Sequence, residues 1–132
     1  MKRKLILICV LVSVSILFFA CYEEPKEEKT PTPTGFRVFS NEGLKVQLRW
    51  DQNAETKYRI QYRSSDMDSW SLESHNGSSP FYGDRHTVQF MERDIGKLFT
   101  FRLQAEKVGS YLNQYTSSDW VETTAVINGE EL

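Results

Sequence analysis

The sequence predicts an all-β protein: a seven-stranded antiparallel β-sandwich that follows a signal peptide and an extended tether. Two observations support the fold class. From Gly35 onward, apolar and polar residues alternate with a period of two in seven short segments, and clusters of turn-forming residues separate these segments. Beyond the first twenty residues, no segment of useful length has the helical period. Short strands at this spacing are typical of two sheets that bury alternate residues against each other.

The strongest strand patterns are 44–50 and 99–105, where every position follows the alternation. Weaker patterns predict strands at 36–38, 58–62, 70–72, 88–90 and 120–126. The inward positions predict a structural core that includes Trp50, Tyr58, Ile60, Tyr62, Val88, Phe99, Phe101 and Leu103. Burial of each Leu, Val or Phe contributes about 1.5–3 kcal/mol, so such a core can hold a small domain together without a disulfide.

Residues 1–20 have the order of an export signal. Three cations follow Met1, an apolar run extends from Leu5 to Ala20, and Cys21 comes directly after. A Cys at this place resembles a bacterial lipoprotein signal, with cleavage before Cys21 and a fatty acid attached there, so that lipid on Cys21 binds the membrane. The alternative is a retained membrane helix, but the apolar run is shorter than the about 20 residues that span a bilayer. We therefore expect a membrane-anchored lipoprotein of the bacterial cell envelope, at the outer membrane or cell surface.

Residues 21–34 read as the lipidated Cys followed by a tether rich in Pro and Glu. Three of the four prolines lie here, and this composition favours an extended polyproline conformation. Fully extended, the tether would reach roughly 40 Å at about 3.1 Å per residue and lift the domain clear of the lipid surface. The predicted sandwich occupies residues 35–127, and residues 128–132 form a short tail.

Charge and cysteine content exclude several classes of function. The chain after cleavage has 13 Lys and Arg against 18 Asp and Glu, without a basic cluster, which argues against nucleic acid as a partner. Cys9 lies in the signal and Cys21 at the anchor, so we expect no disulfide in the folded part.

No arrangement of residues points to catalysis or to a cofactor. His75 and His86 lie near Asp84 in a polar stretch, but no strained nucleophile motif accompanies them, and a solvated loop is the simpler interpretation. Asp66 and Asp68 lack the other oxygen ligands of a calcium loop, so we expect a turn there. The chain is predicted not to be an enzyme and to need neither metal nor cofactor.

Aromatic residues in loops suggest a binding surface instead. Because antiparallel strands alternate in direction, the loops 51–56, 73–86 and 107–116 are expected at one pole, together with the N-terminus of the sandwich. They contain the candidate binding residues Phe81, Tyr82, Tyr111, Leu112 and Tyr115. Tyr in loops is typical of recognition surfaces, since it gives a large contact area at low entropic cost. The simpler alternative is that one or two of these residues fold back and cap the core.

The first functional hypothesis is therefore a lipid-anchored binding or adhesion module that contacts a protein or a glycan through its aromatic loops. A second hypothesis is an accessory subunit of an envelope assembly, docking by a sheet face or an edge strand. A third is a stand-alone carbohydrate-binding accessory domain. Exposed coplanar aromatic rings would favour a glycan, whereas Trp70 or Trp120 pointing outward from a sheet face would favour docking of a subunit.

Several motifs, taken in order, resemble the fibronectin type III family. The family usually has Trp at the end of its second strand, as at Trp50, and a Tyr-x-Val-x-Tyr pattern in the third, where this chain has Tyr58-Arg59-Ile60-Gln61-Tyr62. The stretch Gly96-Lys97-Leu98-Phe99-Thr100-Phe101-Arg102-Leu103-Gln104-Ala105 fits its sixth strand, and Ser117-Ser118-Asp119-Trp120 resembles the approach to its last. The resemblance implies an immunoglobulin-like sandwich.

The chain departs from the family pattern at Phe99. The family has Tyr there, whose hydroxyl hydrogen-bonds back to the preceding loop. Because Phe lacks the hydroxyl, we expect a looser turn at 91–97, held by packing alone. The Leu that normally precedes this position is Arg93 here, so we expect Met91 or Ile95 to fill the core instead.

Overall fold

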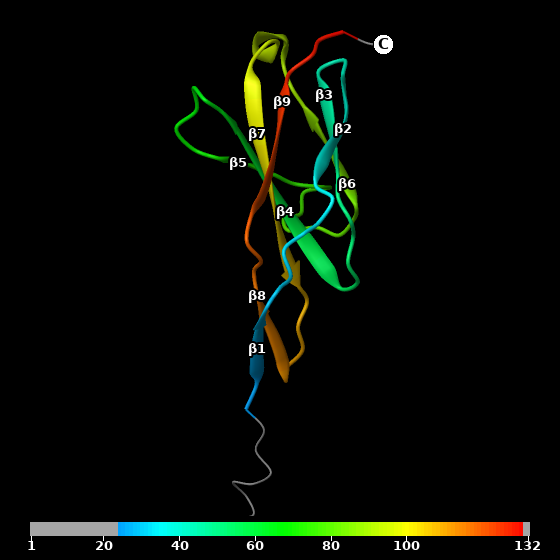
Figure 1. The fold of residues 1–132 in the computed structure, drawn as a ribbon, viewed down its shortest axis with the longest axis vertical. Coiled ribbons are helices and arrows are strands. Elements are labelled where there is room, and N and C mark those ends of the chain that lie inside the picture. Colours follow the sequence, from blue (N-terminus) through cyan, green and yellow to red (C-terminus); the bar gives the residue numbers. More distant parts are fainter. Residues whose placement is uncertain (1–23, 131–132) are drawn as a thin grey trace, which may run out of the picture.

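A computed structural model describes residues 24–130 and contains two antiparallel sheets packed face to face (Figure 1). One sheet has the order β2-β3-β6, and the other has the order β5-β4-β7-β9. Their bounds are β2 (Arg37–Glu42), β3 (Lys45–Arg49), β4 (Thr56–Ser64), β5 (Ser71–Glu73), β6 (Arg85–Gln89), β7 (Leu98–Lys107) and β9 (Val121–Val126). The predicted seven-stranded sandwich is thus confirmed. The predicted signal peptide and Cys21 lie outside the described residues.

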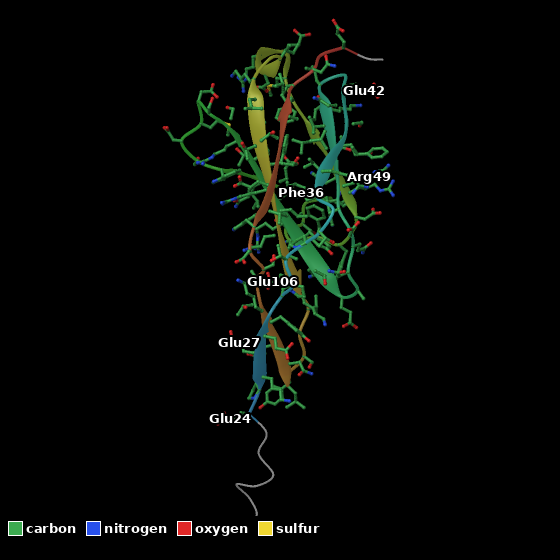
Figure 2. All side chains as sticks on the ribbon, viewed as in Figure 1. Glu24, Glu27, Phe36, Glu42, Arg49 and Glu106 are labelled. Atoms are coloured by element: carbon green, nitrogen blue, oxygen red, sulfur yellow. The ribbon has the colours of Figure 1, made fainter. Side chains whose placement is uncertain are left out.

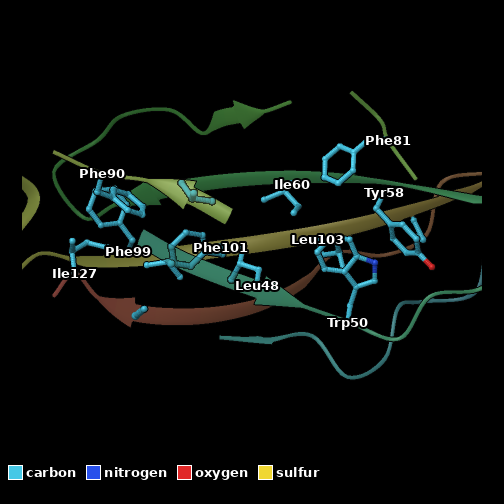
Figure 3. Packing of buried hydrophobic residues seen from close by; sticks show 14 residues of the cluster. Leu48, Trp50, Tyr58, Ile60, Phe81, Phe90, Phe99, Phe101, Leu103 and Ile127 are labelled. Atoms are coloured by element: carbon cyan, nitrogen blue, oxygen red, sulfur yellow. The ribbon is translucent and has the colours of Figure 1, made fainter. Parts of the chain in front are cut away.

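The core lies between the sheets and follows the predicted alternation. Of the eight predicted core residues, only Tyr62 is partly exposed, and it packs against the others. The buried cluster around them is completed by Val46, Leu48, Phe81, Phe90, Ala105, Ala125 and Ile127. Figure 3 shows Leu48, Phe81, Phe90 and Ile127 among the rings of this core. Side-chain burial therefore accounts for the packing of one sheet on the other. In the part of the chain described, no helix is long and apolar enough to cross a membrane.

The segment expected to be a free tether is instead attached to the body. Its residues form β1 (Lys26–Lys29), which pairs in parallel with β8 (Asn113–Thr116) at the lower end of the molecule (Figure 1). Thr30 is buried, and its hydroxyl donates to the carbonyl of Thr116 (2.7 Å) while accepting from the backbone N–H of Lys107 (3.0 Å). Instead of a solvated polyproline segment, Lys26–Lys29 is a β-strand that is hydrogen-bonded to β8.

The N-terminal pole of the sandwich consists of the connections 50–55, 74–84 and 108–112. These connections meet, as predicted from strand direction. The N–H of Val108 donates to the carbonyl of Glu55 (2.7 Å), and Tyr58 and Phe81 exchange two backbone hydrogen bonds (2.7 and 2.9 Å). The candidate loops are therefore one structural unit.

The C-terminal pole consists of the β2–β3 turn, the β6–β7 turn with its short 3-10 helix η1 (Glu92–Asp94), and residues 127–130. The β2–β3 turn runs through Gly43 and Leu44, both with positive φ (59° and 64°), as a two-residue type I′ hairpin requires. The Leu44 carbonyl accepts from the N–H of Phe90 (2.8 Å), and the Leu44 N–H donates to Asn128 (3.0 Å). The turn thereby joins both neighbouring segments.

The β6–β7 turn differs from the prediction in two ways. Met91 and Ile95, expected in the core, are 60% and 50% exposed, because Phe90 and Ile127 already fill that space. The turn is also not held by packing alone, since the Asp94 carboxylate accepts from the N–H of Met91 (3.1 Å) and Gly96 donates to the carbonyl of Ile127 (3.0 Å). The Asp94 carboxylate and the backbone hydrogen bond to Ile127 compensate for the missing hydroxyl at Phe99.

Candidate binding surfaces

The five aromatic-loop candidates do not form one patch. Phe81 is only 5% exposed and lies in the core, with its ring centroid 6.3 Å from that of Trp50. It caps the sandwich, the simpler of the two roles considered for these residues. Tyr82, Tyr111 and Leu112 are exposed, and Tyr115 is partly exposed.

Tyr82 and Tyr115 share a shallow hollow with Lys107 and Val108 at the N-terminal pole. The Lys57 ammonium lies 5.3 Å from the centre of the Tyr82 ring, and the Lys107 ammonium lies 4.8 Å from that of Tyr115. A cation over an aromatic face contributes about 0.5–1 kcal/mol at exposed sites, so each ring gains a weak stabilising contact from the neighbouring lysine.

Tyr111 and Leu112 lie apart from this hollow, at the tip of the β7–β8 connection. Leu112 lines a second hollow with Glu24, Lys26 and Asn113, next to the first described residues of the chain. The tip is thus a neighbour of the N-terminal segment rather than part of the Tyr82 hollow.

A stack of arginine and tryptophan side chains lies on the outer face of the four-stranded sheet. The Arg102 guanidinium lies 4.1 Å from the ring centre of Trp70 and 4.1 Å from that of Trp120, and Arg63 lies 4.4 Å from Trp70. Gln61, paired with Arg102 across β4 and β7, accepts a hydrogen bond from its Nε (2.8 Å). We call these four cation–π partners, Arg63, Trp70, Arg102 and Trp120, the Trp/Arg stack.

Partial burial lowers the pKa of the Arg102 guanidinium; the charge of Glu122 raises it and that of Arg63 lowers it. Arginine nevertheless stays protonated in proteins, because its ordinary pKa exceeds 12. The charge in the stack is therefore constant across the physiological pH range.

The same outer face exposes further apolar side chains. Leu72, Leu98 and Val126 are 56%, 52% and 51% exposed, and Leu98 pairs with Val126 across β7 and β9. Four basic side chains point outward from β4 and β7 on this face and two acidic ones from β7 and β9: Lys57, Arg59, Arg63, Arg102, Glu106 and Glu122. The face therefore combines exposed apolar area with excess positive charge.

The outer face of the three-stranded sheet is simpler. There, the Arg49 guanidinium lies 3.3 Å from the ring centre of Phe39, which is 52% exposed, and Figure 2 shows Arg49 projecting away from the body. Within the described residues, Arg49 and Phe39 form the single cation–π contact of the three-stranded sheet, so the extended stack is confined to the four-stranded sheet.

His86 is buried, not in a solvated loop as predicted. It lies on β6, 7% exposed, with its Nε2 2.8 Å from a carboxylate oxygen of Glu73 and its ring 5.1 Å from that of Phe81. His75 is exposed and lies 5.7 Å from His86, ring centre to ring centre. His75 follows the C-terminal end of β5 and His86 lies on β6, so the contact between the two rings packs these strands together.

The acidic residues considered for metal binding lie in a turn, as expected. Hydrogen bonds from the Ser64 hydroxyl and the Lys97 ammonium lower the pKa of Asp66. Among residues 24–130, no group of three His, Cys, Asp or Glu side chains is arranged to hold a metal ion.

Comparison with known proteins identifies no family match and no curated relative for this chain. Solved structures do match. A chain of a cytokine receptor complex aligns with a TM-score of 0.56 at 18% identity, over 76% of this chain and 51% of its own. The chicken interferon gamma receptor alpha chain aligns with a TM-score of 0.55 at 19% identity, over 73% of this chain and 44% of its own. This chain thus spans about half the length of these receptor chains, and its fold is that of a fibronectin type III-like, immunoglobulin-like β-sandwich.

Proposed function

We propose that this chain is a non-enzymatic, membrane-anchored module of the bacterial cell envelope that docks a protein partner on the outer face of its four-stranded sheet. The observation that supports this most is the Trp/Arg stack, fixed on a regular sheet and flanked by exposed Leu72 and Leu98. Trp and Arg dominate the energetically important positions of protein interfaces. Side chains that are ordered before binding lose less entropy when a partner arrives.

A protein fits this face better than a glycan does. Carbohydrate recognition by aromatic platforms needs free ring faces, and here Arg102 covers faces of both Trp70 and Trp120. The excess of basic side chains on the face favours a partner with an acidic patch. The structural similarity to receptor chains supports a protein partner only at the level of fold analogy.

Anchoring to the membrane rests on the sequence. The order of cations, apolar run, small residue and Cys21 supports lipidation, which holds the module at the envelope surface. Metabolic labelling with a fatty acid should mark the wild-type chain and not the Cys21→Ser variant. Label that persists in the variant would refute lipidation at this residue.

The hollow between Tyr82 and Tyr115 is a second candidate for the partner site. Its support is that Lys57 and Lys107 contact the two rings beside the exposed Val108. Phe81 does not contribute to it, because this side chain is buried in the core.

Site-specific photo-crosslinking in intact cells tests the proposal. A photoreactive amino acid replaces Glu122, which is exposed on β9 beside Arg102, or, as the matched control, Thr87, which is exposed on β6 of the other sheet. We expect a discrete adduct from position 122 and none from 87. Trp70→Ala should reduce the adduct strongly, since an interface hot spot contributes about 2 kcal/mol or more, roughly 30-fold in affinity.

Two outcomes would contradict docking on this face. Equal adducts from both positions would show a non-specific encounter, and an adduct insensitive to Trp70→Ala would remove the stack from the interface. Loss of the adduct in Tyr82→Ala, with Trp70→Ala unaffected, would move the site to the Tyr82 hollow.

A further inference from the structure

The exposed tip of the β7–β8 connection lies where the chain enters the domain. The backbone N–H of Lys26 donates to the carbonyl of Leu112 (2.9 Å), and Glu24 and Lys26 line a hollow together with Leu112 and Asn113. Figure 2 places Glu24 and Glu27 at the same end of the elongated molecule. The tip and the N-terminal entry point are thus neighbours.

Backbone pairing fixes this neighbourhood. β1 pairs with β8 over four residues, from Lys26 with Asn113 to Lys29 with Thr116. An ion pair between the Lys29 ammonium and Asp119 (2.7 Å) and the buried hydroxyl of Thr30 extend the attachment. The tip therefore moves together with the N-terminal segment.

Pairing of β1 leaves little chain between the anchor and the domain. Three residue steps separate Cys21 from Glu24 in the sequence, and because an extended backbone covers at most about 3.6 Å per residue, this length of chain can reach no farther than roughly 11 Å. The headgroup layer on each side of a bilayer is about 5–7 Å thick. A lipid on Cys21 would thus keep the domain at the headgroups rather than roughly 40 Å above them.

We propose that Tyr111 and Leu112 contact the lipid headgroup region of the membrane that holds Cys21, so that the domain stands on its N-terminal pole. This inference rests on the proposed anchoring. Tyr111 is 75% exposed and Leu112 45% exposed. Tyr is enriched at membrane interfaces, where its ring meets apolar chains and its hydroxyl meets water.

The charges around the tip define the kind of surface that fits. Glu24, Glu27 and Glu28 outnumber Lys26 and Lys29 in this segment, so a strongly anionic surface would be repelled. A zwitterionic headgroup layer suits this mixture. The Trp/Arg stack lies on the side of the body, not at this pole, so docking of a protein and contact with lipid do not compete.

A polarity-sensitive fluorophore on a single cysteine tests the contact. The probe is attached to Leu112→Cys in the full lipidated chain, reconstituted into phosphatidylcholine vesicles that contain a spin-labelled lipid. Val126→Cys is the matched control, because Val126 is 51% exposed on β9, near the opposite pole. We expect blue-shifted emission and loss of most fluorescence through the spin label at position 112, with neither at 126.

The same preparation separates failure of the inference from failure of the anchoring. The wild-type chain should take up no thiol label, because lipidation blocks Cys21 and Cys9 leaves with the signal. Labelled wild-type chain, or chain that does not float with vesicles, would refute the anchoring. Chain that floats but is equally unquenched at positions 112 and 126 would overturn the tip contact alone.

Discussion

The C-terminal pole closes the core with backbone hydrogen bonds and the Asp94 carboxylate, whereas the N-terminal pole adds two side-chain hydroxyls to its backbone hydrogen bonds. At the first, Gly43 donates to Glu130 (2.9 Å) and Leu44 to Asn128 (3.0 Å). At the second, the Tyr58 hydroxyl accepts from the N–H of Asn53 (2.8 Å), and the Thr30 hydroxyl joins β1 to the body. Backbone hydrogen bonds are available to any residue except Pro, so the first pole tolerates the loss of a side-chain hydroxyl better.

This contrast explains why Phe at position 99 is acceptable. The hydroxyl that the family pattern places there is replaced by Asp94, which holds the N–H of Met91, and by the two bonds between Ile127 and the turn. At the N-terminal pole, the backbone N–H of Asn53 donates to the Tyr58 hydroxyl, so this closing contact depends on a side chain. The predictions below test this difference.

The largest expected effect is that of Phe90→Ala at the C-terminal pole. Phe90 is 5% exposed and its ring centre lies 4.6 Å from that of Phe99, so its removal leaves a cavity and should lower the free energy of unfolding by about 3–5 kcal/mol. Met91→Ala, next to it but exposed, should change stability by less than about 0.5 kcal/mol. Urea denaturation of both variants measures this. A larger loss of unfolding free energy in Met91→Ala would show that Met91 packs in the core.

Thr30→Val should have the next largest effect. The substitution keeps the shape but leaves the backbone N–H of Lys107 without its acceptor, at a cost of about 1–3 kcal/mol. Amide hydrogen exchange should also become faster along β1 and β8. Thr124→Val, on the exposed side of β9, is the control and should leave both measurements unchanged. Unchanged exchange in Thr30→Val would mean that pairing of β1 does not need the hydroxyl.

Tyr58→Phe should have the smallest effect, about 1 kcal/mol, the contribution of one hydrogen bond. It should also change the alkaline limit of stability. Burial raises the pKa of Tyr58 above 10; its hydrogen bond from Asn53 opposes this shift. Above pH 10 the unfolded chain therefore loses the proton before the folded chain does, and stability falls as pH rises through the folded pKa.

The variant should lack this component of the alkaline decline, as measured by denaturation between pH 9 and 12. Tyr111→Phe, on the exposed tip, serves as the control and should retain the wild-type decline. A decline of equal steepness in wild type and Tyr58→Phe would assign it to another group.

The strands and the core were predictable because both follow from local alternation. His86 could have been placed in the core by the same rule, since on β6 it has the parity of Val88, and the buried Phe90 just after the strand continues that parity. Burial of Phe81 could not, because it arises from a bridge to Tyr58, far away in sequence. Local patterns do not report such pairings.

The two candidate surfaces differ in the same way. Outward Trp70 and Trp120 could be anticipated from strand parity, but their stacking on Arg102 depends on the register between β5, β4, β7 and β9. Pairing of β1 with β8 left no periodic signal, because all four residues of β1 are exposed. The contact between Lys26 and the Leu112 tip therefore could not be predicted from the sequence.

The charged residues of β1 lie on an edge strand, where they protect against pairing with foreign strands. β1 covers one side of β8, and its own far side is the outermost edge of the small two-stranded sheet. A bare strand edge recruits foreign strands and seeds aggregation, and charged residues are a common protection against this. Lys26, Glu27, Glu28 and Lys29 are all charged, so the free edge of β1 disfavours pairing with a strand of another molecule. Removal of the chain up to and including Lys29 would expose the edge of β8 and allow self-association.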